Sequence, residues 1–144
     1  MIYTPATKNA MFFCWLAHKD QTDISGCPYI FHPIHLAEQM NDEDTTVTAL
    51  LHDVVEDSDM TLDDLRNAGF NDRVLTAVSL LTRKEGTPYM DYIQALKSNP
   101  IARVVKMADL QHNCDMTRLD KDSITLRDSL RFGKYLRAIS VLSE

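Results

Sequence analysis

The sequence predicts an all-α protein, a single compact domain of about eight helices over residues 1–144. Three observations favour this fold class. Apolar residues recur at helical spacing along most of the chain, Thr-Pro and Asn-Pro pairs mark helix starts, and only 4 glycines and 5 prolines are present. A chain of this length buries roughly two thirds of its unfolded surface, so one core can form without disulfides.

The N-terminal part of the chain carries five helix signals, each a capping side chain or a proline ahead of an apolar repeat. The predicted helices are 6–19 after Thr4-Pro5, one that starts within 29–36 with Pro33 in its first turn, 44–57 after Asn41-Asp42, one from Thr61 to Gly69, and 74–82 after Asn71 or Asp72. His32 then lies at the mouth of the second helix.

Three further helices are predicted in the C-terminal part. Thr87-Pro88 starts a helix that runs to about Ser98, Asn99-Pro100 starts one that runs to about Leu119, and the last covers about 122–142. No segment reads as a convincing strand, and there is no internal repeat or long linker.

Composition and charge exclude several classes of function. Cys14, Cys27 and Cys114 are widely spaced and form no C-x-x-C pair, so we expect reduced thiols in a cytoplasmic protein. The N-terminus has no signal-peptide pattern and no apolar run is long enough for a membrane span. A net charge of −6 disfavours a nucleic-acid polymer as partner but is compatible with a small phosphorylated nucleotide. No sequence feature defines an oligomeric state.

Residues 50–57, Leu-Leu-His-Asp-Val-Val-Glu-Asp, place four ionisable side chains inside an aliphatic run. On one continuous helix, these four would share an arc of about 140°, with aliphatic side chains on the opposite side. Burying carboxylates beside an imidazole costs several kcal/mol per ion unless an opposite charge lies among them. A bound divalent cation meets that need better than the alternative, a solvated acidic stripe, because apolar residues flank the run on both sides.

A second group of polar side chains lies on the helix predicted from Pro100. Lys106, Asp109 and Asn113 fall within about 60° on that helix. Taken alone, the group is better interpreted as an exposed i, i+3 Lys-Asp pair than as a ligand site. His32 alone could likewise cap a helix or fill a loop pocket.

Three motifs in order, residues 28–33, 49–57 and 106–113, resemble the HD hydrolase domain of RelA/SpoT-type (p)ppGpp hydrolases and of small stand-alone relatives. The resemblance covers about residues 3–120. It implies an all-α HD fold in which His32, His52, Asp53 and Asp109 hold Mn²⁺. Two imidazoles and two carboxylates leave open positions on a six-coordinate ion, and Fe²⁺ or Zn²⁺ are the alternatives to Mn²⁺.

The same resemblance implies catalytic roles for Glu56, Asp57 and Asn113. The two carboxylates would orient or deprotonate the attacking water, and Asn113 would position phosphate, with Lys106 as a further substrate-binding residue. His35 and His112 match no family role, and a structural role is favoured for His35.

The substrate-binding positions depart from the family. Asp23-Ile24-Ser25 stands where an Arg-Lys-Ser run contacts the nucleotide, so only Ser25 is retained as a substrate-binding candidate. Leu110 stands where Arg is usual and Met116 where Thr is usual. The proposed metal ligands are all present, whereas the residues that recognise the base have changed.

Three functions remain open from the sequence. The first is removal of the 3′-pyrophosphate of (p)ppGpp, and the second is hydrolysis of another nucleotide or cofactor phosphate, such as that of NADPH. The third is a non-catalytic nucleotide-binding module, which the complete set of candidate catalytic residues disfavours. We expect no synthetase activity from these 144 residues, because they leave no room for a second domain.

Overall fold

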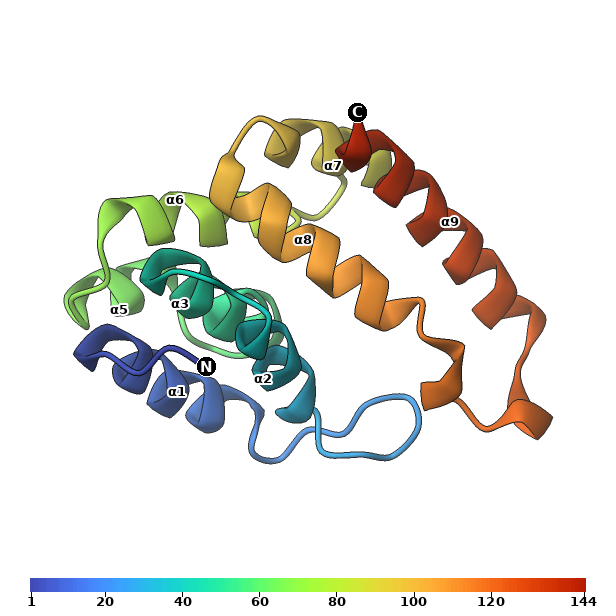
Figure 1. Ribbon diagram of the computed structural model, residues 1–144, viewed down its shortest axis with the longest axis horizontal. Coiled ribbons are helices and arrows are strands. Elements are labelled where there is room, and N and C mark those ends of the chain that lie inside the picture. Colours follow the sequence, from blue (N-terminus) through green and yellow to red (C-terminus); the bar gives the residue numbers. More distant parts are fainter.

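The computed structural model describes all residues from 1 to 144, and it confirms the all-α prediction (Figure 1). There is no β-strand; a single bridge between Thr22 and Pro28 closes the loop before the second helix. The elements in order are α1 (Pro5–His18), α2 (Phe31–Glu38), α3 (Glu43–Leu51), α4 (Val54–Asp57), α5 (Leu62–Asn67), α6 (Asp72–Leu81), α7 (Tyr89–Lys97), α8 (Pro100–Asn113), the 3₁₀ turns η1 (Met116–Arg118) and η2 (Lys121–Ser123), and α9 (Leu126–Ser143).

Side-chain caps place most helix starts where the sequence predicts them. The side chains of Thr4, Asp42, Thr61, Asn71 and Asn99 each accept a backbone N–H in the first turn of α1, α3, α5, α6 and α8. Each cap satisfies an N–H that has no partner within the helix and typically contributes about 1 kcal/mol.

The prediction of one continuous helix over 44–57 is wrong. Helix α3 ends at Leu51, the chain turns at His52 and Asp53, and α4 starts at Val54. The His52 ring folds back so that Nδ1 lies 2.7 Å from the Ala49 carbonyl oxygen, which in a continuous helix would serve the Asp53 N–H. His52 and Asp53 therefore project from a turn, and only Glu56 and Asp57 lie on α4.

Three other helix ends also differ from the prediction. Helix α8 stops at Asn113 instead of about Leu119, because Asp115 caps the separate turn η1. Thr125 caps α9, which starts at Leu126 rather than near 122. Thr87 does not cap α7; the N-cap position belongs to Pro88, which offers no side-chain hydrogen bond.

Helix α3 is the centre of the core. It packs against α1, α2, α6 and α8, and residues 45–51 are buried without interruption. Helix α9 lies along α7 and α8, at the end of the molecule away from α1 (Figure 1). None of the helices combines the length and the apolar character that a membrane crossing requires.

Candidate metal centre

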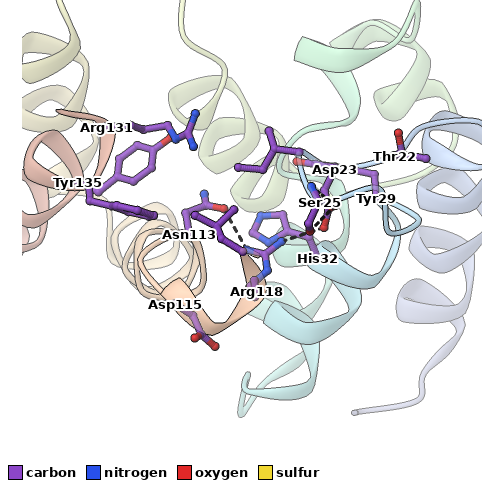
Figure 2. Close-up of a pocket in the computed structure, with 13 residues that line it drawn as sticks. Thr22, Asp23, Ser25, Tyr29, His32, Asn113, Asp115, Arg118, Arg131 and Tyr135 are labelled. Atoms are coloured by element: carbon purple, nitrogen blue, oxygen red, sulfur yellow. Dashed lines mark hydrogen bonds and ion pairs between the residues drawn. The ribbon is translucent and has the colours of Figure 1, made fainter. Parts of the chain in front are cut away.

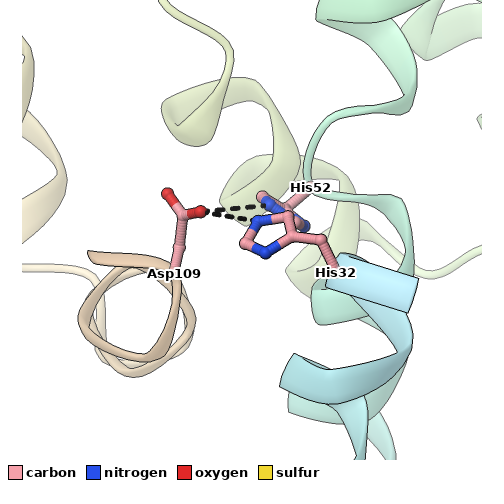
Figure 3. Close-up of side chains that lie close together, drawn as sticks. All are labelled: His32, His52 and Asp109. Atoms are coloured by element: carbon pink, nitrogen blue, oxygen red, sulfur yellow. Dashed lines mark hydrogen bonds and ion pairs between the residues drawn. The ribbon is translucent and has the colours of Figure 1, made fainter. Parts of the chain in front are cut away.

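Three buried side chains from separate parts of the chain meet beside α3. His32 comes from α2, His52 from the turn after α3, and Asp109 from α8 (Figure 3). Their ligand atoms all lie within 4.8 Å of one another. His32 Nε2 is 2.9 Å and His52 Nε2 is 3.7 Å from Asp109 Oδ1. The group forms because α3 packs against both α2 and α8.

The surroundings of His52 Nε2 favour a positive charge, because two carboxylates face this nitrogen. A carbonyl only accepts, so the Nδ1 that faces Ala49 O carries a proton, and Nε2 points inward. There it has no hydrogen-bond partner, although Asp53 Oδ2 is 3.0 Å away. Burial lowers the pKa of His52, but the charges of Asp53 and Asp109 outweigh it and hold that pKa well above its usual value. A proton or a metal ion is therefore favoured at this nitrogen.

His32 is oriented by His112, to which the sequence assigned no role. The two Nδ1 atoms are 2.7 Å apart, so one must donate. Burial, with help from the charges of Arg118, His32 and His35, lowers the pKa of His112 to about 4, so His112 is neutral at pH 7. This bond leaves His32 Nε2 directed at Asp109. His112 also stacks on His35, with ring centroids 4.0 Å apart.

Asp109 is held by two neighbours on its own helix. Lys106 Nζ lies 2.7 Å from Oδ2, and the Asn113 amide donates to Oδ1 at 3.0 Å. The Lys106–Asp109 pair is buried, unlike the exposed pair that the sequence alone favoured. Burial raises the pKa of Asp109, but the Lys106 charge together with the interactions of His32 and His52 outweighs it, and the pKa falls well below the usual range. The Lys106 ammonium is thus directed at Asp109, and Lys106 is not among the residues that line the cavity beside this group, which is described below.

Asp53 lies beside the three-residue group rather than within it. Its Oδ2 is close to His52 Nε2 and also accepts a hydrogen bond from the Tyr29 hydroxyl. Burial raises the pKa of Asp53, but the interactions with His52 outweigh it and lower the value to about 2. Asp53 is therefore a carboxylate held by Tyr29, another contact that the sequence did not predict.

Glu56 and Asp57 lie on the first turn of α4, and both side chains reach solvent. The Glu56 carboxylate accepts the backbone N–H of Arg83 at 3.1 Å. Desolvation, the charge of Asp53 and the charge of Glu56 together raise the pKa of Asp57 to about 6, and the first two also raise that of Glu56. Carboxylates with raised pKa values are suitable proton acceptors near neutral pH.

A cavity of about 290 Å³ adjoins the three-residue group, because His32 belongs to both (Figure 2). Ser25 and Asn113, two of the predicted functional residues, line it. Its other lining residues come from the loop before α2, from η1 and from α9: Thr22, Asp23, Ile24, Tyr29, Asp115, Arg118, Leu119, Arg131, Phe132 and Tyr135. The α9 residues lie beyond the segment covered by the three motifs, so the motifs could not reveal them.

Comparison with known proteins finds no matching family model. A guanosine-3′,5′-bis(diphosphate) 3′-pyrophosphohydrolase of Vibrio cholerae is 40% identical over 87 residues, 58% of this chain and 12% of that protein. The bifunctional (p)ppGpp synthase/hydrolase SpoT of Escherichia coli is 33% identical over 112 residues, 67% of this chain and 16% of that protein. The relatives of this chain are SpoT/RelA-type proteins.

The fold agrees with that relationship. A metazoan ortholog of SpoT, described as hydrolysing ppGpp, superimposes with a TM-score of 0.76 at 20% identity, covering 99% of this chain and 87% of that one. A probable GTP pyrophosphokinase of Mycobacterium leprae is 36% identical over 129 residues, 78% of this chain. The chain spans only 12% to 16% of the length of these curated relatives.

Proposed function

We propose that this chain is a metal-dependent hydrolase that removes the 3′-pyrophosphate of guanosine 3′,5′-bis(diphosphate). One observation carries the proposal: three buried ligand side chains from α2, the α3–α4 turn and α8 converge beside a cavity. Relatives named as 3′-pyrophosphohydrolases of this nucleotide support the choice of substrate.

The proposed ion is Mn²⁺, with Fe²⁺ or Zn²⁺ as alternatives, held by His32, His52, Asp109 and Asp53. The lone pair of His52 Nε2, directed at two carboxylates, fits a divalent cation. Such an ion, when bound, polarises a phosphoryl oxygen and lowers the pKa of water. His112 and Tyr29 hold two of the ligands in position through their hydrogen bonds.

In the proposed reaction, water attacks the phosphorus bonded to the 3′ oxygen, and the bond between that phosphorus and oxygen breaks. Glu56 or Asp57 takes the proton of the water, because both carboxyls have raised pKa values. The Asn113 amide, which lines the cavity, orients the phosphate. The departing 3′ oxygen takes up the proton lost by the water, and the products are guanosine diphosphate and pyrophosphate.

A second candidate is hydrolysis of another phosphorylated nucleotide or cofactor, such as the 2′-phosphate of NADPH. Asp23 and Ile24 favour it, because the cavity wall that they form carries a carboxylate and an apolar side chain. A substrate that differs in its base or ribose is compatible with such a wall.

Product analysis separates these candidates. The protein with one equivalent of Mn²⁺ is incubated with ppGpp, pppGpp, NADPH and nucleoside mono-, di- and triphosphates, and released pyrophosphate and orthophosphate are measured. Pyrophosphate from ppGpp is the expected result, and orthophosphate from NADPH alone would favour the second candidate. If no compound is hydrolysed, both enzymatic proposals are wrong and the non-catalytic binding module remains.

A further inference from the structure

Arg118 lines the cavity and is connected to the metal centre through hydrogen bonds. Its Nη1 donates to the His112 carbonyl at 3.0 Å and to Asn113 Oδ1 at 3.4 Å, and Asn113 in turn donates to Asp109. Its Nη2 lies 3.4 Å from Oδ2 of Asp23, another lining residue of the cavity that is 95 residues earlier in the chain (Figure 2). These contacts use the edges of the guanidinium and leave its faces free of hydrogen bonds.

Asp23 holds Arg118 in place and is not an unpaired charge. Its Oδ1 accepts from the backbone N–H groups of Ser25 and Cys27 and from the Ser25 hydroxyl, all within 3.0 Å. These bonds and the Arg118 charge outweigh desolvation and lower the pKa of Asp23. The carboxylate is therefore fixed by its own loop, with Oδ2 left for the guanidinium.

The walls around Arg118 suit a flat, partly apolar group. Ile24, Leu119, Phe132 and Tyr135 line the same cavity. A guanidinium held at its edges stacks on planar rings through its faces, which an ammonium cannot do. Arg131, the other arginine of the cavity, is paired with Asp128 at 2.5 Å.

We propose that Arg118, positioned by Asp23, is the surface on which the base of the substrate stacks. The inference rests on the proposed function, which supplies the substrate. It places the base-binding residue outside residues 23–25, the loop that contacts the nucleotide in the family that the sequence resembles. Asp23 is a positioning residue: it acts on the nucleotide only through Arg118.

The test compares Arg118→Lys with Arg66→Lys, a matched control on α5 whose exposed arginine pairs only with Asp63. Lysine at position 118 keeps the charge but loses the planar face, so KM for ppGpp should rise about tenfold while kcat stays within about twofold. Arg66→Lys should change neither constant. An unchanged KM in Arg118→Lys would overturn the inference and leave the proposed function intact.

A second variant tests the positioning role. Asp23→Asn should raise KM less than Arg118→Lys does, and it should add nothing when Arg118 is already lysine, because both changes act on the same contact. Additive effects of the two substitutions would show that Asp23 acts independently of Arg118.

Equilibrium binding separates failure of this inference from failure of the proposed function. Guanosine diphosphate and inorganic pyrophosphate are titrated into the wild-type and Arg118→Lys proteins in the absence of turnover. We expect weaker binding of the nucleotide and unchanged binding of pyrophosphate in the variant. If the wild-type protein hydrolyses nothing, the function is wrong, and equal nucleotide affinities or no nucleotide binding at all would reject the stacking site as well.

Discussion

The imidazole of His52 determines how the proposed centre responds to pH. In the metal-free protein, Asp53 and Asp109 overcome the effect of burial and hold the pKa of His52 well above its usual value, so Nε2 is protonated at neutral pH. A metal ion and this proton compete for one lone pair.

Metal binding should therefore release a proton. Because a raised pKa keeps His52 charged as pH rises, Mn²⁺ affinity should increase with pH across the neutral range. Calorimetric titration of Mn²⁺ in buffers of different ionisation enthalpy measures the proton released. A binding enthalpy that is the same in every buffer would show that no ligand loses a proton.

Glu56 tests the assignment of the proton acceptor. Glu56→Gln removes one of the two proposed proton acceptors but keeps the size and polarity of the side chain, so we expect unchanged metal stoichiometry and, if Glu56 is the acceptor, a loss of turnover of about 10²-fold or more. Turnover is measured as pyrophosphate release and metal content by elemental analysis. Wild-type turnover in this variant would remove Glu56 from the mechanism.

The raised pKa of Asp57 predicts that kcat/KM falls at acid pH. Its pKa is raised to about 6, so the carboxyl takes up a proton as pH falls through that value and can then no longer accept one. A bound cation shifts this pKa downward, because it favours the carboxylate. kcat/KM should therefore fall below about pH 6, with a limb that disappears in Asp57→Asn. An acid limb with the same midpoint in Asp57→Asn and the wild type would contradict its assignment to Asp57.

At the scale of elements, capping side chains predict where helices begin, but helical periodicity does not predict where they are interrupted. Caps such as Asn99 act within one turn, and the sequence therefore predicts the start of α8 correctly. The turn at His52 and the end of α8 at Asn113 instead coincide with local side-chain hydrogen bonds, of the His52 ring with Ala49 and of Asp115 with Thr117. Helical periodicity contains no information about those contacts, so the break between α3 and α4 and the position of Arg118 could not be predicted.

Asn99 offers a test of how the cap of α8 supports the site. Asn99→Ala leaves the Ala102 N–H without its partner and should lower the free energy of unfolding by about 1 kcal/mol. Asn99→Asp keeps an acceptor at the cap and should therefore keep most of the wild-type stability. Denaturant unfolding of the metal-free proteins measures both. Equal stability of the alanine and wild-type proteins would show that the cap contributes nothing.

For the whole molecule, the three sequence motifs contain the residues of the three-residue group, but they do not predict the hydrogen bonds that hold those side chains in place. His32, His52 and Asp109 converge because α3 packs between α2 and α8, and Lys106 and Asn113 lie on one side of α8, as helical spacing requires. The contacts of His112, Tyr29 and Arg118 depend on how the chain runs between the helices. These supporting contacts were missed because each joins segments that have no fixed spacing in sequence.

Metal content in matched histidine variants tests the proposed centre most directly. His52→Ala removes a proposed ligand, whereas His35→Ala removes an exposed imidazole of α2 that lies outside the three-residue group. After loading with Mn²⁺ and desalting, elemental analysis should find about one ion per chain in the wild-type and His35→Ala proteins and almost none in His52→Ala. An equal metal content in His52→Ala and the wild type would contradict the proposed centre.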